Sequence, residues 1–183
     1  MFGAEMFGDF DVDLDEHYFH WLHSRGERSS YSEVVMILPR PGDRVLTLTK
    51  SFYPEGTYNL PSGGIEPGET PELAFAREVS EETGLSVNLV GQIGRIEHHC
   101  LFDQSSLDFV SHVMLGTQTQ EPAHAADPDE SISGYIDASA SDLARFSAHM
   151  RRMTGRWAGF GKFRATALDF AADWLERRLG ERP

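Results

Sequence analysis

The stretch GGIEPGETPELAFAREVSEETGL, residues 63–85, carries most of the structural and chemical information in this sequence. Its second half predicts a helix over residues 70–83. Thr70 is suited to the N-cap and Pro71 to the first helical position, where the missing N–H has no intrahelical partner in any case. Gly84 is suited to the position just after the helix, because glycine readily adopts the left-handed backbone found there. Both ends of this helix are therefore marked in the sequence.

One face of the predicted helix is almost entirely acidic. Glu78, Glu81 and Glu82 are spaced i, i+3 and i+4, so they share a face, and Arg77 is the only base of the segment. Like charges at this spacing repel each other, and the helix dipole disfavours anions near the C-terminus. The ordinary alternative is a solvated acidic face. A hard divalent cation, Mg²⁺ or Mn²⁺, would reverse these energies because it prefers carboxylate oxygens.

The turn before the helix is rich in glycine. Gly63, Gly64 and Gly68 allow the backbone to approach a ligand closely. The turn is not a nucleotide P-loop, because Gly68 is followed by Glu69 rather than by lysine. A glycine-rich turn is a weak signal when it stands alone, so its meaning depends on the acidic helix that follows it.

The turn and the helix together resemble the Nudix box of the Nudix hydrolases, G-x5-E-x7-R-E-U-x-E-E-x-G-U, in which U is an aliphatic residue. Every specified position is occupied within residues 63–85, by Gly63, Glu69, Arg77, Glu78, Val79, Glu81, Glu82, Gly84 and Leu85. The resemblance implies an α/β fold, an α/β/α sandwich with a mixed β-sheet. It does not identify a subfamily, since no auxiliary motif of coenzyme A or NADH pyrophosphatases accompanies the box.

The resemblance also implies an activity and a set of metal ligands. Nudix hydrolases cleave a nucleoside diphosphate linked to another moiety, by water attack on phosphorus and with a divalent metal. By position, Glu82 is the first expected metal ligand, together with Glu78 and Glu81. Glu69 is an outer ligand through water, Glu78 is alternatively the general base, and Arg77 orients a glutamate of the box. We therefore expect a Mg²⁺- or Mn²⁺-dependent pyrophosphohydrolase; the alternative is a Nudix-fold nucleotide-binding or sensor domain without catalysis.

Further candidates lie outside the helix. Similar enzymes often place a catalytic glutamate on a loop beyond the box, and Glu130 stands at such a position; a solvated loop acid is the alternative. The expected substrate-binding residues are Lys50, Tyr58, Ser62 and Gly63. Lys50 could contact a phosphate, although a surface lysine is the simpler interpretation. Tyr58 stands where the family usually has an aromatic residue shortly before the box.

The net charge and the composition limit the classes of partner that we expect this protein to bind. The 183 residues include 16 basic and 29 acidic ones, which gives a net charge of −13. Such a field repels nucleic acid and anionic lipid, so we expect a nucleotide-type small-molecule substrate, no extended nucleic acid and no membrane partner. A homodimer is left open. The single Cys100 excludes an intrachain disulfide framework, and the first residues do not read as a secretory signal, so we expect a cytoplasmic location.

The rest of the sequence predicts strands interleaved with helices. We expect an N-terminal tail and short helix over residues 1–29, with residues 1–12 as a tail or as a docking strip for a partner, and a single Nudix domain over residues 30–180. Strands are expected at 34–38, 45–50, 87–90, 93–98 and 109–116, and helices at 13–24, 142–153 and 163–175. The first two strands are expected to form a hairpin, and Ser141 is expected to cap the helix that follows it.

Overall fold

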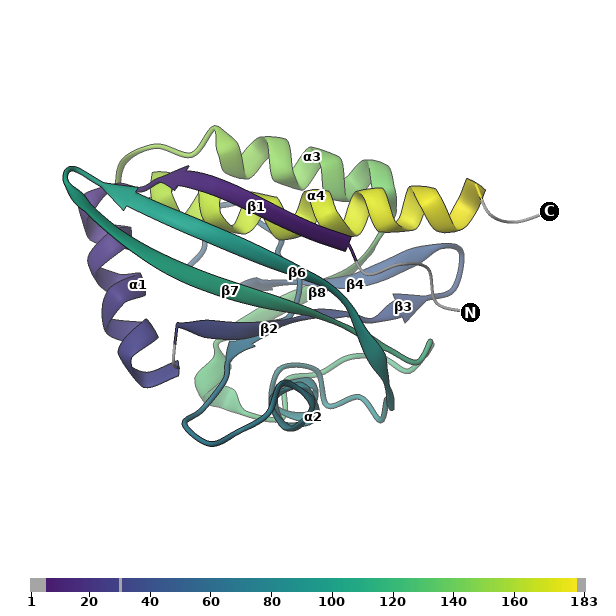
Figure 1. The fold of residues 1–183 in the computed structure, drawn as a ribbon. Helices are drawn as coiled ribbons and strands as arrows, with labels where there is room; N and C mark the ends of the chain where they lie inside the picture. The colour runs from purple at the N-terminus through teal and green to yellow at the C-terminus, as the bar shows by residue number, and fades with distance from the viewer. Residues whose placement is uncertain (1–5, 30, 181–183) are drawn as a thin grey trace.

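Within residues 6–29 and 31–180, which the computed structural model describes, eight strands form two sheets (Figure 1). The larger sheet has five strands, in the order β1 (Met6–Asp13), β6 (Leu89–Phe102), β7 (Ser105–Gly116), β2 (Ser32–Ile37) and β5 (Ser62–Gly64). The smaller sheet has the order β3 (Pro39–Arg40), β4 (Arg44–Lys50) and β8 (Ile132–Ala138). The larger sheet is mixed, because β1 pairs with β6 and β2 pairs with β7 in parallel while its other pairs are antiparallel.

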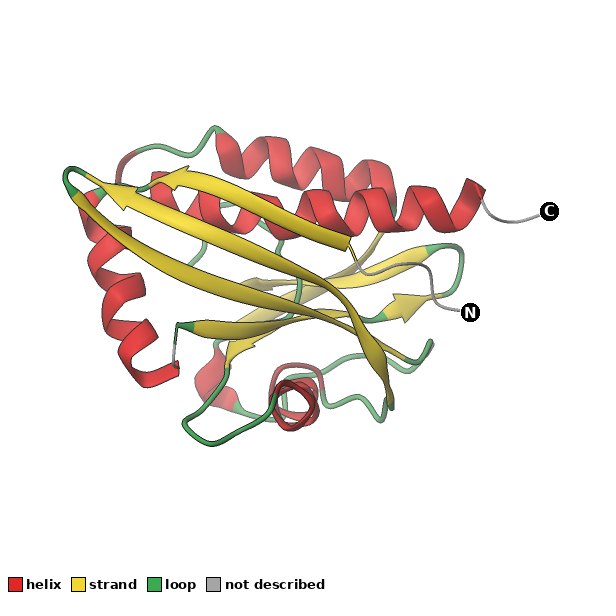
Figure 2. Ribbon diagram, viewed as in Figure 1, coloured by secondary structure: helices red, strands yellow, loops and turns green. Residues whose placement is uncertain are grey.

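Helices cover both faces of the larger sheet. They are α1 (Glu16–Ser29), α2 (Pro71–Thr83), α3 (Ala140–Arg151) and α4 (Ala158–Gly180), with short 3-10 helices η1 (Pro128–Glu130) and η2 (Gly155–Trp157). Figure 2 shows α3 and α4 running side by side on one side of the sheet and α2 on the other. Residues of β2 alternate between the two cores: Val35 and Ile37 pack in the core that contains α4, and Val34 and Met36 in the core that contains α2. The expected α/β/α sandwich is thereby confirmed.

The boundaries of α2 agree with the sequence. The Thr70 side chain accepts a hydrogen bond from the Leu73 N–H at 3.4 Å, and Pro71 begins the helix. Gly84 ends it with φ of 61°, and its N–H donates to the Ser80 carbonyl. Because Phe75 is buried against the sheet, the glutamate-bearing face is turned away from that core.

Part of the predicted tail is a strand. β1 pairs in parallel with β6, from Met6 opposite Gly94 to Asp13 opposite Leu101. Val12 is buried while Asp11 and Asp13 are exposed, so acidic and apolar residues alternate as in a half-buried strand. Residues 1–5 of the predicted tail lie outside the described residues, and the division of the chain at residue 29 stays a prediction.

The prediction of a hairpin over residues 34–50 is wrong, except for the residue pairs next to the turn. β2 pairs with β7 and β5 in the larger sheet, whereas β4 pairs with β3 and β8 in the smaller one. Antiparallel pairing across the turn is limited to Pro39 opposite Val45 and Arg40 opposite Arg44. Pro39 has no N–H to donate to a ladder, which suits the point where the chain changes sheets.

Other boundaries also differ from those expected. The cap of α3 is Ser139, not Ser141, because the Ser139 side chain accepts from the Asp142 N–H at 3.3 Å and the Asp142 carboxylate accepts from the Ser139 N–H at 3.1 Å. The two short strands predicted between residues 87 and 98 are one long strand, β6, whose pairing is irregular near Gly91 and Gly94. Cys100 lies on this strand and is fully buried. Among the described residues, no helix is both long and apolar enough to cross a membrane.

Candidate active site

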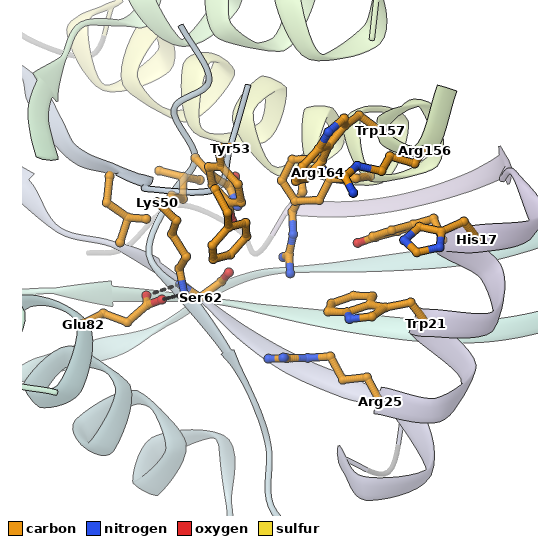
Figure 3. Close-up of a pocket in the computed structure, with 16 residues that line it drawn as sticks. His17, Trp21, Arg25, Lys50, Tyr53, Ser62, Glu82, Arg156, Trp157 and Arg164 are labelled. Carbon is orange, nitrogen blue, oxygen red and sulfur yellow. Dashed lines mark hydrogen bonds and ion pairs between the residues drawn. The ribbon is translucent and has the colours of Figure 1, made fainter. Parts of the chain in front are cut away.

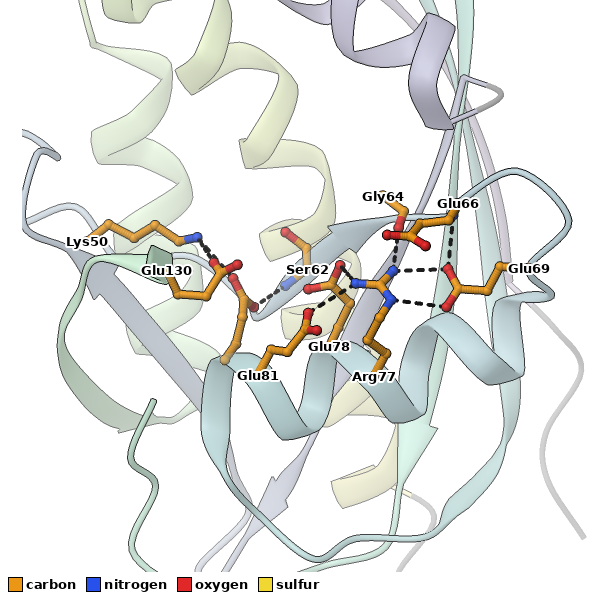
Figure 4. A network of polar contacts seen from close by, with 10 residues as sticks. Lys50, Ser62, Gly64, Glu66, Glu69, Arg77, Glu78, Glu81 and Glu130 are labelled. Atoms are coloured by element: carbon orange, nitrogen blue, oxygen red, sulfur yellow. Dashed lines mark hydrogen bonds and ion pairs between the residues drawn. The ribbon is translucent and has the colours of Figure 1, made fainter. Parts of the chain in front are cut away.

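Three carboxylates converge between α2 and η1. Glu78, Glu81 and Glu130 each offer one oxygen, and these oxygens lie within 4.8 Å of one another (Figure 4). Glu78 is buried and the other two side chains are half-buried. A set of hard carboxylate oxygens at this spacing fits a divalent cation. We call these three side chains the carboxylate group.

The loop before β8 brings Glu130 to α2 through backbone hydrogen bonds. The N–H groups of Ala126 and Asp127 donate to the Glu81 carbonyl at 3.0 and 3.2 Å, and the His124 N–H donates to the Thr83 carbonyl at 2.9 Å. These carbonyls belong to the last turn of α2 and have no partner within the helix. The loop therefore satisfies the end of the helix and at the same time fixes the position of η1, which carries Glu130.

Glu82 has different partners from the carboxylate group. Its side chain is 1% exposed and accepts from the Ser62 N–H at 2.8 Å and from the Lys50 ammonium at 3.1 Å. Burial raises the pKa of Glu82 to about 7. Lys50 also donates to Glu130 at 2.6 Å, so one ammonium bridges the two glutamates. The prediction that Glu82 is the first metal ligand stays a prediction.

Arg77 connects the glycine-rich turn with the acidic face of α2. Its guanidinium donates two hydrogen bonds to the Glu69 carboxylate, both at 3.0 Å, and one to the Gly64 carbonyl at 2.9 Å. It also donates to Glu78 at 2.7 Å and to Glu81 at 3.1 Å. The hydrogen bonds from Arg77 lower the pKa of Glu69 below its usual range. The Glu69 carboxylate thus fixes the position of the Arg77 guanidinium.

Gly63 lies directly beneath Glu78. A Cβ at this position would overlap the Glu78 carboxylate, so only glycine allows this buried carboxylate to rest on the β5 backbone. The sequence suggests that the turn lets backbone approach a ligand; in the structure the group that approaches Gly63 is a glutamate of the same chain. Burial raises the pKa of Glu78, which reflects the cost of a buried negative charge.

The charges of this region do not balance. Five glutamates contact two cationic side chains, Lys50 and Arg77; the glutamates are Glu69, Glu78, Glu81, Glu82 and Glu130. The excess of carboxylates raises the energy of the ionised forms and creates a local field that attracts a multivalent cation. The donor set therefore fits a divalent metal ion in charge as well as in geometry.

A cavity of about 440 Å³ opens beside this region (Figure 3). Lys50, Ser62 and Glu82 line one side, and residues of α1, η2 and the start of α4 line the other. Its aromatic lining comprises Tyr18, Trp21, Phe52, Tyr53, Trp157 and Phe160. The size is within the range that holds a small-molecule ligand. We refer to it as the aromatic cavity.

Sequence reasoning did not find the aromatic cavity. One signal was available: His17, Trp21 and Arg25 recur every fourth residue, so they share a face of α1, and all three line the cavity. Such a stripe alone does not distinguish a ligand site from a helix interface.

Tyr58 is the expected site residue that the structure does not bring together with the others. Its ring stacks on Phe146 of α3 at a centroid distance of 5.1 Å. The next residue, Asn59, lines the aromatic cavity, as does Tyr53. By contrast, the other three expected substrate-binding residues contact glutamates. Lys50 contacts Glu82 and Glu130, the Ser62 N–H donates to Glu82, and Gly63 lies beneath Glu78.

The structure is thus an α/β/α sandwich in which a carboxylate-rich helix face, whose donor set fits a divalent cation, lies beside a cavity. The chain belongs to the NUDIX domain family, whose family model matches residues 31–154. The resemblance of residues 63–85 to the Nudix box is therefore confirmed at the level of the family.

Curated relatives and solved structures agree with this family. The chain is 29% identical over 121 residues to the NAD-capped RNA hydrolase NudC of Photobacterium profundum, covering 66% of this chain and 42% of that protein. It is 27% identical over 138 residues to the oxidized purine nucleoside triphosphate hydrolase of Danio rerio, covering 70% and 84%. The chain thus spans less than half the length of NudC. The crystal structure of a MutT protein from Methanosarcina mazei Go1 shares the fold, with a TM-score of 0.53 at 18% identity, covering 83% and 96%.

Proposed function

We propose that this protein hydrolyses the pyrophosphate linkage of a nucleoside diphosphate joined to another moiety, by attack of water on phosphorus and with a divalent metal. The observation that carries the proposal is the convergence of Glu78, Glu81 and Glu130, from two distant segments, beside a cavity large enough for a nucleotide. The names of two relatives, a NAD-capped RNA hydrolase and an oxidized purine nucleoside triphosphate hydrolase, support a nucleotide-type substrate.

Glu78 and Glu81 of the carboxylate group would hold Mg²⁺ or Mn²⁺, with Glu82 and Glu69 as further candidates. The bound ion would neutralise charge on the phosphoryl oxygens and acidify a water molecule. Arg77 contributes by fixing Glu78 and Glu81 in place through its hydrogen bonds. This positioning matters because small displacements of catalytic groups lower rates strongly.

The remaining roles follow from position. Glu130, or alternatively Glu78, accepts the proton of the attacking water, since both carboxylates belong to the converging group. Lys50 contacts Glu82 and Glu130 and lines the aromatic cavity, which supports the proposal that its ammonium contacts a phosphate of a substrate that spans both regions. The backbone of Ser62 and Gly63 lines the same junction.

The expected partners need separate tests. The net charge of −13 argues against binding of extended nucleic acid, whereas NudC is named for acting on capped RNA. A capped RNA 5′ end therefore belongs among the substrates to be tried. A cytoplasmic location and a homodimer stay predictions from the sequence.

A hydrolysis screen, read by chromatographic separation of the products, tests the proposal. Nucleoside triphosphates, nucleotide sugars, ADP-ribose, dinucleoside polyphosphates and NAD-capped RNA are incubated with the protein and Mg²⁺ or Mn²⁺. We expect hydrolysis of at least one class, which is lost in Glu78→Gln and kept in Glu72→Gln, an exposed glutamate of the same helix. Nucleotide binding without hydrolysis of any class would instead favour the sensor domain.

A further inference from the structure

The last four carbonyl groups of α2 have no partner within the helix, as at the end of any α-helix. Each of them accepts a hydrogen bond from outside the helix. Three accept from backbone N–H groups: Ser80 from Gly84, Glu81 from Ala126 and Asp127, and Thr83 from His124. The fourth, that of Glu82, accepts from the Tyr135 hydroxyl at 2.5 Å. Among the described residues, Tyr135 is therefore the one side chain that holds this turn by its carbonyl groups.

The Tyr135 ring is fixed independently of its hydroxyl. It lies on β8, opposite Leu48 of β4. It also packs against the core cluster that includes Phe75 and Val79 of α2. Removal of the hydroxyl alone would therefore leave the ring in its packing position and take one hydrogen bond from the Glu82 carbonyl. Because Glu82 is buried, the loss of this donor is costly at that carbonyl.

The hydroxyl also acts where the electrostatics of α2 are least favourable. The C-terminus of a helix carries partial negative charge, and the anionic side chains of Glu81 and Glu82 lie in this last turn, which contains no basic residue. A donor to the Glu82 carbonyl offsets part of that charge. Burial, followed by the charge of Glu82, raises the pKa of Tyr135 to about 12, so the hydroxyl keeps the proton that it donates.

Tyr135 and Glu130 belong to one segment of the chain, in which η1 is followed by β8. Figure 4 shows Glu130 reaching toward the face of α2 that carries Glu78 and Glu81. The N–H groups before η1 and the hydroxyl on β8 bind the same turn of α2, one on each side of Glu130. The distance from Glu130 to the acidic face therefore depends on both contacts.

We propose that Tyr135 is a positioning residue for the carboxylate group. Its hydroxyl holds the last turn of α2 against β8, so that the side chains of Glu81 and Glu82 keep their place relative to Glu130. Tyr135 acts through the backbone of Glu82 and contacts no reacting group itself. The inference rests on the proposed function where it concerns hydrolysis, whereas the position of the carboxylates can be measured without a substrate.

Amide hydrogen exchange of the full chain, without metal, gives the first test. In Tyr135→Phe we expect the N–H groups of His124, Ala126 and Asp127 to exchange at least about ten-fold faster, because they donate to the turn that the hydroxyl holds. The Ala74 N–H, which donates to the Thr70 carbonyl in the first turn of α2, should exchange at an unchanged rate.

Tyr31→Phe is the matched control for this measurement. It removes the same hydroxyl group from a ring that packs against His23 of α1, at a centroid distance of 5.9 Å. The exchange rates of the N–H groups that donate to the last turn of α2 should equal those of the unmodified protein in this variant.

Calorimetric titration of the full chain with Mn²⁺ gives the second test. We expect the Kd for Mn²⁺ to rise at least about three-fold in Tyr135→Phe, because the carboxylates lose part of their fixed spacing. With a substrate found in the hydrolysis screen, kcat should fall about ten-fold while KM changes less than about two-fold. A merely structural role would lower the urea midpoint and leave kcat and the Kd for Mn²⁺ unchanged.

Unchanged exchange of the His124, Ala126 and Asp127 N–H groups in Tyr135→Phe would overturn the inference, as would a Kd for Mn²⁺ equal to that of the unmodified protein. Neither measurement requires hydrolysis. If no substrate is cleaved in the screen and Tyr135→Phe still shows both changes, the proposed function fails and this inference stands. Hydrolysis by the unmodified protein, with no effect of Tyr135→Phe, would refute the inference and leave the proposed function in place.

Discussion

The carboxylate group and the aromatic cavity meet at Lys50, Ser62 and Glu82 but are built in opposite ways. In and around the carboxylate group, charged side chains are tied to one another, through Arg77 on one side and Lys50 on the other. In the aromatic cavity, the Trp21 and Phe52 rings are exposed, and buried polar atoms of Tyr18, Asn59 and Arg164 have no hydrogen-bond partner within the part of the chain that the structure describes. One region is held together by contacts between its own charged side chains, whereas the other is an open space lined mainly by aromatic rings.

This difference suggests separate roles for the two regions, in catalysis and in the choice of substrate. In the proposed reaction, the carboxylate group would act from a geometry fixed by the chain itself, as preorganised catalysis requires. The lining of the aromatic cavity would then set the choice of substrate, because a ligand that left buried polar groups unpaired would bind less tightly. Changes in the first region should therefore act on kcat, and changes in the second on KM and on the choice of substrate.

The largest effect is expected from Glu130→Gln. If Glu130 is the general base, kcat should fall about 10²–10⁴-fold while metal affinity falls much less. The measurement is kcat as a function of pH together with calorimetric titration of Mn²⁺. Glu121→Gln, an exposed acid in the same loop, is the matched control. A pH–rate profile with the same acidic limb as that of the unmodified protein would exclude this role.

Gly63→Ala is expected to lower kcat about 10²-fold, because the added methyl displaces the Glu78 carboxylate and small misplacements are costly. Gly134→Ala is a suitable control, since a Cβ there would meet only the Thr49 side chain, at an ordinary 3.5 Å. Activity and urea unfolding are measured for both variants. Full activity in Gly63→Ala would show that the contact between Gly63 and Glu78 is dispensable.

We expect acidic pH to lower the free energy of unfolding through His98, which is buried beneath the aromatic cavity. His98 is buried and hydrogen-bonded to Ser111, and burial, followed by the charge of Arg164, lowers the pKa of His98 from 6.5 to about 3. Between pH 6.5 and about pH 3, His98 is therefore protonated in the unfolded chain but not in the folded chain. The free energy of unfolding decreases as the pH falls below 6.5. The loss from this group is about 2 kcal/mol at pH 5.

Urea unfolding at pH 7 and pH 5 measures this loss, with His98→Gln as the comparison. The variant should be less stable at pH 7 because its packing is altered, yet it should lose about 2 kcal/mol less than the unmodified protein on going to pH 5. An equal loss in both proteins would show that other groups govern the acid response.

The smallest effect is expected from Tyr58→Leu. Because Tyr58 packs on Phe146 outside both regions, KM should change less than about two-fold, while stability falls by about 1 kcal/mol through loss of the stacked pair. Tyr53→Leu, which alters the lining of the aromatic cavity, should raise KM more. A larger KM effect for Tyr58 than for Tyr53 would restore Tyr58 as a substrate-binding residue.

A feature of this protein could be predicted from the sequence when it is built from one short segment, and not when it depends on distant segments. The ends of α2 and its acidic face depend on residues within one short segment, and their spacing alone places three carboxylates on one face. The partner of a strand depends on residues far away: β1 pairs with β6 across some ninety positions, and β2 and β4 belong to different sheets although they are neighbours in sequence. The aromatic cavity needs α1, the segment from Leu48 to Ser62 and the start of α4 together, so no local pattern could indicate it.

The burial of Cys100 has a practical consequence for measuring motion in this protein. Desolvation raises the pKa of its thiol to about 12, and the side chain is fully covered, so maleimide or spin-label reagents will not reach a reactive thiolate there. A cysteine introduced at an exposed position on α1, such as His20, would then be the only labelling site. The mobility of a spin label at that site could report whether the surroundings of α1 change when nucleotides are added, with no need to remove the native thiol first.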